Sequence, residues 1–296
     1  MAVEKLHADE PDIDEVLARS LLRNQCQDIA SLPITELKSA GTVNVIYRVG
    51  DDRYIRLPRS QEGSDGLEKE LELLPRLAPH LPVAVPEPLR RGVPGNGYPY
   101  TWAVYRWLPG EPFDRLKARS EREAATDLAG FIDALRRIDP ENGPRSGRLP
   151  LRQLDQRTRA AIVEVGTSFD AAALTAAWEH ALEAPEWTGR SVWRHGDLLP
   201  PNVLAKDGCI SAIIDFGGVG VGDPASDVIP AWSMFGPTGR EAFRSALDVD
   251  EAIWRRARGY ALHQALLIIP YYAYTNPDFT AMAKQTVRSV LDDLRL

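Results

Sequence analysis

Two short polar signatures lie close together in the second half of the chain. The first runs Arg194-His-Gly-Asp197-Leu-Leu-Pro-Pro-Asn202, and the second runs Ile213-Ile-Asp-Phe-Gly217. Asp215 follows Asp197 by eighteen positions, and the apolar residues before Asp215 predict a strand between the two motifs. Any fold of this chain must therefore accommodate two polar loops joined by a strand.

These side chains match the needs of phosphoryl transfer. Moving a γ-phosphoryl group to a hydroxyl requires one carboxylate to orient the hydroxyl and accept its proton. It also requires oxygen ligands that hold Mg²⁺ on the phosphates. Asp197 fits the first role, and Asn202 and Asp215 fit the second.

An Asp-x₄-Asn loop followed by Asp-Phe-Gly is the pair of motifs found in kinase-like enzymes. With Gly222-Asp-Pro-Ala-Ser-Asp227 downstream, the chain resembles the aminoglycoside phosphotransferase family from about Thr35 to its C-terminus. Each motif alone is an ordinary turn or loop, but three in the right order favour the family. The resemblance implies an α+β, protein-kinase-like fold with two lobes. Residues 1–107 would form a nucleotide-binding sheet lobe that ends in a hinge, and residues 108–296 a mainly helical lobe with the catalytic loop, the metal loop and the acceptor region.

Length and composition agree with two lobes in one soluble enzyme. A chain of 296 residues exceeds the usual size of one core. Its net charge of -7 and pI near 5.4 argue against a nucleic-acid surface. We expect Cys26 and Cys209 to be reduced core residues. The N-terminus lacks the apolar stretch of a signal peptide, and the most apolar run, 265–269, stops at Pro270. We therefore expect a cytoplasmic protein without membrane contact, either monomer or homodimer.

Periodicity predicts the elements. A helix begins near Asp12, where Glu15 completes a capping box, and a second covers 66–74 before a proline-rich loop at 81–88. Strands are predicted at 34–37, 43–49, 53–57 and 100–108. Further helices are predicted at 121–138, 151–165, 171–182, 225–235, 240–247, 251–269 and 279–294.

The resemblance assigns the nucleotide-binding residues, with ATP as the donor and GTP possible. Gly41, Thr42 and Asn44 would cover the phosphates, although their motif alone also fits an ordinary hairpin turn. Arg56 would hold the α- and β-phosphates where a Lys is commoner, paired with Glu70; an exposed strand Arg is the alternative. The hinge residues that bracket the base would be Tyr105, Arg106 and Trp107, although aromatic residues in a strand are more often core.

The resemblance also assigns roles in catalysis. Asp197 would accept the acceptor's proton, His195 would hold the catalytic loop by hydrogen bonding, and Asn202 and Asp215 would bind Mg²⁺. Asp227 would accept hydrogen bonds from the catalytic-loop backbone. The acceptor region or its supporting shell would include Asp223, Trp232 and Tyr271.

The nature of the acceptor stays open at this stage. Family membership points first to an aminoglycoside or a related antibiotic, a polycation that needs carboxylates around it. The available carboxylates are Asp223, Asp227, Asp248, Asp250 and Asp278. An aromatic C-terminal region would also suit a macrolide or another largely apolar acceptor; its members are Trp232, Phe235, Trp254, Tyr260, Tyr271, Tyr272 and Tyr274. A kinase for a sugar, choline or homoserine-like alcohol and a nucleotide-binding pseudokinase are the alternatives.

Overall fold

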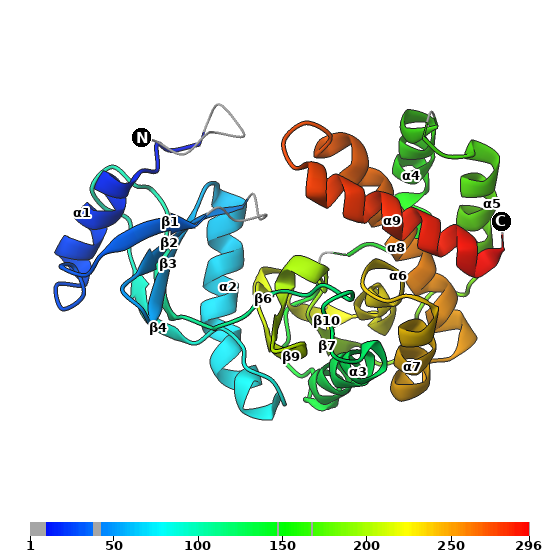
Figure 1. Cartoon of the computed structure of the whole chain (residues 1–296), viewed down its shortest axis with the longest axis horizontal. Coiled ribbons are helices and arrows are strands. Elements are labelled where there is room, and N and C mark those ends of the chain that lie inside the picture. The colour runs from blue at the N-terminus through cyan, green and yellow to red at the C-terminus, as the bar shows by residue number, and fades with distance from the viewer. Residues whose placement is uncertain (1–9, 38–42, 147, 167, 296) are drawn as a thin grey trace. The chain divides into compact units, whose positions relative to one another are not determined.

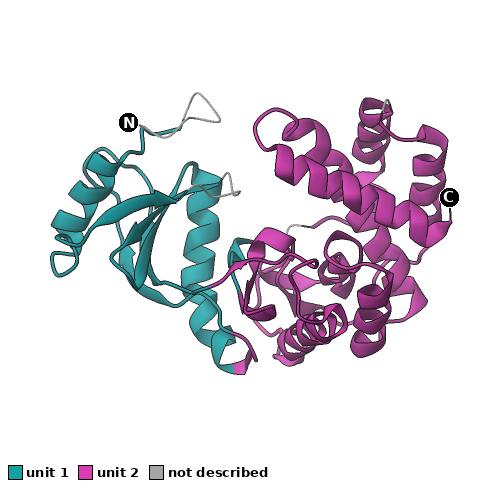
Figure 2. Ribbon diagram, in the orientation of Figure 1, with its two compact units in different colours: residues 1–79, 84–109, 213–217 teal, residues 80–83, 110–212, 218–296 magenta. Residues whose placement is uncertain are grey.

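A computed structural model of the chain describes residues 10–37, 43–146, 148–166 and 168–295. These form two compact units (Figures 1 and 2). Unit 1 comprises residues 1–79, 84–109 and 213–217, and unit 2 comprises residues 80–83, 110–212 and 218–296. Unit 1 holds an antiparallel sheet and unit 2 is mainly helical, which confirms the α+β class.

Unit 1 is built on a five-stranded sheet in which every neighbouring pair is antiparallel. The strand order is β1-β2-β3-β5-β4. The strands are β1 (Ile34–Leu37), β2 (Asn44–Val49), β3 (Arg53–Pro58), β4 (Pro88–Gly92) and β5 (Trp102–Arg106). The predicted strands at 34–37, 43–49, 53–57 and 100–108 are all present within two residues at either end.

One helix covers each face of this sheet. Because side chains alternate along a strand, Val45, Tyr47, Ile55 and Leu57 join one buried cluster together with residues of α1 (Glu15–Gln25). Side chains on the opposite face, such as Tyr105, pack instead on α2 (Gln61–Leu77). Polar residues of β2 and β3 on that second face are thereby brought under α2.

The starts of both helices follow from their capping residues. Asp14, rather than the predicted Asp12, caps α1 by accepting from the Leu17 N–H at 2.8 Å. Ser60 caps α2 by accepting from the Gly63 N–H at 3.2 Å, so this helix starts before the predicted Gly66. Pro75 lies inside α2, near its end.

The sequence interpretation missed β4. This strand starts at Pro88 and carries the exposed Arg90 and Arg91. A proline and two charged residues do not form the apolar alternation typical of a strand, yet both are tolerated at the edge of a sheet. The strand lies at that edge.

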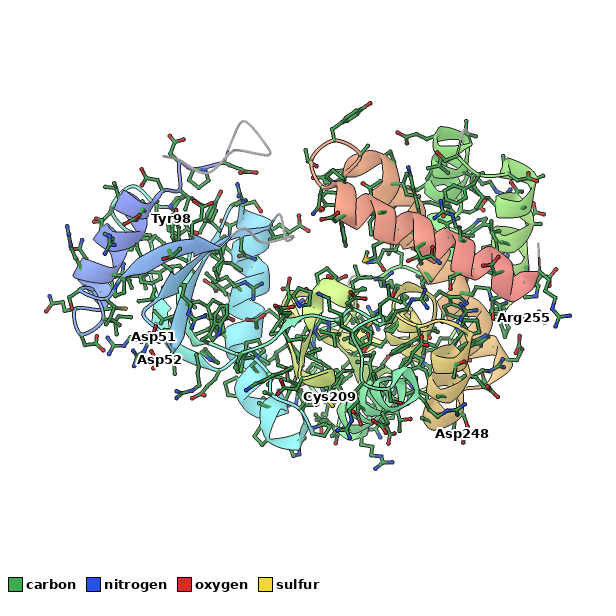
Figure 3. The ribbon with its side chains drawn as sticks, viewed as in Figure 1. Asp51, Asp52, Tyr98, Cys209, Asp248 and Arg255 are labelled. Carbon is green, nitrogen blue, oxygen red and sulfur yellow. The ribbon has the colours of Figure 1, made fainter. Side chains whose placement is uncertain are left out.

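Unit 2 contains two small sheets. In one, β7 (Val192–Arg194) pairs with β10 (Gly220–Gly222). The other has the order β6-β8-β9, with β6 (Glu111–Pro112), β8 (Val203–Lys206) and β9 (Cys209–Ile213). The β8–β9 turn is Asp207-Gly208, whose φ values of 53° and 78° suit an Asp-Gly hairpin. Cys209 is exposed on β9 (Figure 3), so the expectation of a core position was wrong, whereas Cys26 is buried.

Helices form the rest of unit 2. They are α3 (Glu121–Arg137), α4 (Leu151–Val165), α5 (Ala171–Leu182), α6 (Pro230–Ser233), α7 (Pro237–Leu247), α8 (Glu251–Tyr271) and α9 (Pro277–Leu294). The predicted helix at 225–235 is wrong, because the chain forms a 3₁₀ turn, Pro224–Val228, followed by the short α6. Pro230 lacks the N–H that a continuous helix would need there.

Helix α8 is the central helix of unit 2 and packs against α4, α5 and α9. Two arginines on it, Arg256 and Arg258, are buried with carboxylate partners: Arg256 pairs with Asp223 and Arg258 with Asp293, at 2.8 and 2.7 Å. Buried charges persist only when paired in this way. Over the described ranges, no helix has both the length and the apolar character needed to span a bilayer.

Candidate functional site

The loop between β7 and β8 requires glycine at its centre. Gly196 has φ +87°, which side-chain-bearing residues rarely adopt. A Cβ atom at this position would lie 2.7 Å from the carbonyl oxygen of Gly218. The glycine of the His-Gly-Asp motif thus allows two backbone segments to approach closely and fixes where Asp197 begins.

Asp227 anchors the start of this loop. Its carboxylate oxygens accept hydrogen bonds from the backbone N–H of His195 at 2.7 Å and of Gly196 at 2.8 Å, and its side chain is almost fully buried. These are the contacts expected from the sequence. His195 is buried as well, and its ring Nδ1 lies 3.3 Å from the Asp197 N–H, with the ring tautomer assigned from this hydrogen bond. The histidine therefore shapes the loop.

Two amide side chains orient the Asp197 carboxylate. Asn202 Nδ2 donates to Asp197 Oδ2 at 3.0 Å and to its backbone carbonyl at 2.9 Å. Gln264 Nε2 donates to Asp197 Oδ1 at 3.2 Å. The carboxylate, which is only partly buried, is thus held by a donor at each oxygen. Such donors fix the position of the carboxylate oxygens.

The sequence interpretation missed Gln264 and Arg148. Gln264 lies on α8, and Arg148, just before α4, donates to the Gly196 carbonyl at 3.1 Å. Burial lowers the pKa of Arg148, and the charge of Asp197 opposes that shift. The one available signal was the polar pair His263-Gln264 inside the apolar run of α8.

In unit 1, Arg56 is the centre of a buried polar cluster. Its Nη1 lies 3.0 and 2.9 Å from the two carboxylate oxygens of Glu70, and its Nη2 lies 2.7 Å from Asp215 Oδ1. The Asn44 amide, turned so that its oxygen faces the guanidinium, accepts from Nε at 3.1 Å and Nη2 at 3.2 Å. Arg56 is therefore buried and multiply paired, not an exposed strand residue.

Glu70 has further donors. It accepts from the Tyr105 hydroxyl at 2.6 Å and from the Phe216 N–H at 2.9 Å. Burial alone would lower the pKa of Arg56, because it disfavours the charged guanidinium. The negative charges of Glu70 and Asp215 outweigh that effect and raise the pKa of Arg56 well above its ordinary value. Glu68, the neighbouring acid, bonds instead to Arg91 and Thr101. The pairing of Arg56 with Glu70 is as predicted.

Asp215 has an uncommon backbone conformation, with φ +65°, a region that Asp and Asn adopt more readily than most residues. Its carboxylate offers the hard oxygen atoms that Mg²⁺ prefers, and in unit 2 the amide oxygen of Asn202 is a ligand of the same kind. In the described part of the chain, no three His, Cys, Asp or Glu side chains gather as a metal cluster. Mg²⁺ usually takes only one or two carboxylates from a protein and completes its shell with water and phosphate oxygens, so the carboxylate of Asp215 suits this ion.

The other predicted nucleotide residues lie as follows. Gly41 and Thr42 are outside the described residues. The side chain of Tyr105 is fully buried, and its burial, with the charge of Glu70, raises its pKa. The backbone N–H groups of Arg106 and Trp107 donate to the carbonyls of Glu87 and Asp52, at 3.0 and 2.8 Å. These N–H groups are therefore already used within the unit.

The predicted acceptor residues occupy different places. Asp223 forms a two-pronged ion pair with Arg256, at 2.8 and 3.2 Å. Trp232 is buried, and its ring centroid lies 4.6 Å from that of Trp254, which favours a packing role. Tyr271 is exposed by 58% and lines a hollow beside Gln264.

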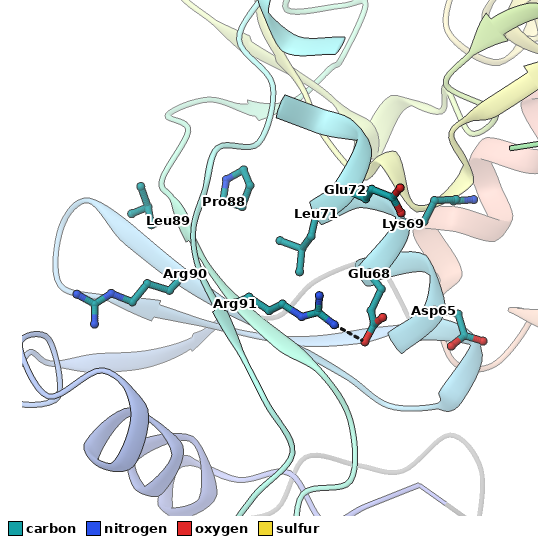
Figure 4. A pocket seen from close by; sticks show the side chains of 9 residues that line it. All are labelled: Asp65, Glu68, Lys69, Leu71, Glu72, Pro88, Leu89, Arg90 and Arg91. Carbon is teal, nitrogen blue, oxygen red and sulfur yellow. Dashed lines mark ion pairs between the residues drawn. The ribbon is translucent and has the colours of Figure 1, made fainter. Parts of the chain in front are cut away.

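A separate hollow of about 760 Å³ lies in unit 1 between α2 and β4 (Figure 4). Its charged side chains include Glu68 and Arg91, which form an ion pair at 3.0 Å. None of the predicted nucleotide, metal or catalytic residues that the structure describes lines it. We therefore assign it no part in the site.

His263, next to Gln264, gives a pH-dependent prediction. The Thr158 hydroxyl donates to Leu154, so its oxygen accepts from His263 Nδ1 at 2.8 Å. Burial chiefly, and then Arg148 and Arg157, lower the pKa of His263 to about 4. Between pH 6.5 and 4 the unfolded chain binds a proton that the folded chain rejects, so stability should fall on acidification, by up to about 3 kcal/mol.

The check is denaturant unfolding of the wild type and His263→Gln across this pH range. The variant should show a flatter stability profile. His80→Gln, a change at an exposed histidine, is the matched control. Parallel wild-type and His263→Gln profiles would disprove the assignment.

The sequence was then compared with known proteins. The model of the Phosphotransferase enzyme family matches residues 35–260. A comparison with curated proteins finds no match.

Solved structures share the fold. The GDP and kanamycin complex of APH(2″)-IIia has a TM-score of 0.75 and 21% identity, over 94% of this chain and 99% of that one. The macrolide 2′-phosphotransferase MphH from Brachybacterium faecium has a TM-score of 0.61 and 24% identity, over 92% and 97%. Macrolide 2′-phosphotransferase type I has a TM-score of 0.63 and 19% identity, over 96% and 99%. The predicted kinase-like fold is confirmed.

Proposed function

Because the chain belongs to the phosphotransferase enzyme family, we propose that it moves the γ-phosphoryl group of ATP or GTP to a hydroxyl of a small molecule, with Mg²⁺. The observation that carries the proposal is the Asp197 carboxylate, held by Asn202 and Gln264 on a loop that Asp227 anchors. A partly exposed carboxylate oriented in this way is suited to accept a proton from a bound hydroxyl.

In this proposal Asp197 orients the acceptor hydroxyl and takes its proton as the new bond to phosphorus forms. Phosphoryl transfer has a loose transition state in most analyses, so position should matter more than basicity. This gives a reason for the two amide donors, which fix the carboxylate. His195 and Asp227 act by keeping the loop in shape.

Unit 1 supplies most of the residues proposed for the nucleotide and its metal, and unit 2 supplies Asn202. Arg56 offers a guanidinium that can contact phosphate oxygens, and Glu70 holds it in place. Asp215 and Asn202 offer oxygen ligands for Mg²⁺, which when bound would neutralise charge that develops on the phosphates. In the described structure Asp215 pairs with Arg56, so binding of the metal and phosphates would exchange this ion pair for new partners.

An antibiotic is the proposed class of acceptor. Aminoglycoside and macrolide phosphotransferases both share the fold, so both acceptor types are candidates for this chain. A kinase for a cellular alcohol stays the alternative. A pseudokinase is disfavoured because Asp197, Asn202, Asp215, Arg56 and Glu70 are all present.

The test is a nucleotide-consumption assay with aminoglycosides, macrolides and small alcohols offered separately. We expect consumption that depends on one acceptor class and stops when EDTA removes Mg²⁺. ATP and GTP are compared in the same assay. Equal consumption with and without every acceptor, or full activity in EDTA, would refute the proposal.

A further inference from the structure

A hollow of about 670 Å³ lies in unit 2, and one side chain of its wall contacts Asp197. Residues of α4 and α8 form its walls, and Gln264, which donates to Asp197 Oδ1 at 3.2 Å, is one of them. Arg148, which bonds to the Gly196 carbonyl, is another. Its volume is within the range of pockets that bury a drug-sized ligand. A molecule bound here would contact Gln264, which holds the carboxylate of the proposed base.

The charges around this hollow do not suit a polycation. Its described lining carries two guanidinium groups, from Arg148 and Arg157, and one carboxylate, from Glu164. His263 also lines it and is neutral near pH 7, since its pKa is lowered to about 4. If the carboxylate of Asp197 is counted together with that of Glu164, two negative charges balance the two guanidinium groups. A ligand with several ammonium groups would therefore be repelled by two guanidinium groups here and would find few carboxylates to offset that repulsion.

The carboxylates that the sequence offered to a polycation do not line this hollow, and three of the five have partners elsewhere. Asp223 pairs with Arg256, and Asp227 accepts from the loop backbone. Asp250 caps α8, and Asp248 lies in a left-handed conformation at the end of α7 (Figure 3). Neither these nor Asp278, in the first turn of α9, is among the described residues that line the hollow.

The remainder of the wall is largely apolar. Leu267 and Ile268 contribute aliphatic surface from α8. At the end of that helix the rings of Tyr271 and Tyr272 pack edge to face, with centroids 4.7 Å apart, and both line the hollow. Apolar and aromatic walls with a few polar groups are typical of sites for largely apolar ligands.

One polar atom indicates where a ligand donor would bind. The side-chain oxygen of Gln264 is buried and has no hydrogen-bond partner among the described residues. A buried oxygen without a donor is costly, and a hydroxyl or N–H group of a ligand would satisfy it. Because the nitrogen of the same amide bonds to Asp197, that donor would lie beside the proposed base.

We propose that this hollow takes a hydroxylated acceptor with a broad apolar face and no more than one positive charge, the chemistry of a macrolide, and discriminates against polycations such as kanamycin. This inference rests on the proposed function for its claim that the bound hydroxyl is phosphorylated. It rests on the walls of the hollow alone for its claim about which molecule binds.

The experiment measures binding and transfer separately. Calorimetry with the full chain compares the affinity for erythromycin, a macrolide, with the affinity for kanamycin. Mass spectrometry then shows whether each molecule gains a phosphoryl group in the presence of nucleotide and Mg²⁺. We expect erythromycin to bind at least ~10-fold more tightly than kanamycin. Leu267→Asn should weaken erythromycin binding by ~10-fold, because it replaces apolar wall with an amide, and leave kanamycin unaffected.

A charge reversal tests the electrostatic part. Arg157 is exposed, so Arg157→Glu should fold normally and should raise kanamycin affinity by ~10-fold. Arg122→Glu makes the same change in net charge on α3, away from the hollow, and should alter neither affinity.

The outcomes are distinct. Tighter binding and phosphorylation of kanamycin would overturn the inference and leave the proposed function standing. Erythromycin binding with no phosphorylated product from either molecule would support the hollow's assignment but count against the proposed function. Binding of neither molecule, or equal effects of Arg157→Glu and Arg122→Glu, would overturn the inference.

Discussion

Asp197→Asn should lower turnover by at least ~10²-fold while nucleotide affinity and unfolding temperature stay close to those of the wild type. Asn has nearly the same shape as Asp but cannot accept the proton of the acceptor hydroxyl. Folding should tolerate the change, because the Gln264 amide can turn and present its oxygen to the new amide. The measurements are steady-state kinetics with a productive acceptor, nucleotide calorimetry and thermal unfolding.

Asp207→Asn is the matched control for this variant. Asp207 lies in the β8–β9 turn of the same unit, with φ 53°, a conformation that Asn adopts readily. The control makes the same chemical change and should keep full activity. Wild-type turnover in Asp197→Asn would remove Asp197 from the reaction.

Asp215→Ala should eliminate the increase in nucleotide affinity that Mg²⁺ gives the wild type. The substitution removes the carboxylate proposed to bind the metal, so calorimetry with and without Mg²⁺ should give the same affinity in the variant. It also removes one partner of Arg56, while Glu70 still neutralises the guanidinium.

Two further variants separate the metal from the backbone. Alanine is disfavoured at φ +65°, whereas Asn is tolerated there, so Asp215→Asn tests the loss of charge with less strain. Asp51→Ala removes an exposed carboxylate from the β2–β3 turn of the same unit (Figure 3) and should bind nucleotide with its normal Mg²⁺ dependence. An undiminished Mg²⁺ effect in both Asp215 variants would exclude Asp215 as a ligand.

The sequence predicted those parts of the fold that depend on local pattern. The strands of unit 1, except β4, and most helices follow from alternation and helical spacing. Pairing of Arg56 with Glu70 followed from the family resemblance, which placed a cation on one strand and an acid on the next helix. The hydrogen bonds from His195 and Gly196 to Asp227 had the same origin.

Other features depend on contacts between distant parts of the chain. Gln264 is 67 positions from Asp197, and nothing in its neighbours indicates which residue it meets. The Asn44 amide was expected near phosphates, and the structure places it against Arg56. The exposure of Cys209 follows from the position of β9 in a small sheet, which the apolar character of its sequence did not reveal.

From the sequence, the acidic residues of the C-terminal region could be counted as available to a polycation, but their partners could not be located. The structure pairs Asp223 with Arg256 and uses Asp250 as a helix cap. Arg157 and Glu164, seven residues apart on α4, instead face the hollow beside Asp197. Their role was not visible from α4 alone.

The central claim is tested most directly by following the phosphoryl group itself. The chain is incubated with Mg²⁺, an acceptor that it binds, and a nucleotide whose γ-phosphoryl oxygens carry a heavy isotope, and the products are identified by mass spectrometry. The account predicts an acceptor with one added phosphoryl group that carries the label, and a yield that falls with Asp197→Asn but not with Asp207→Asn. Label found only in free phosphate or on the protein would contradict it.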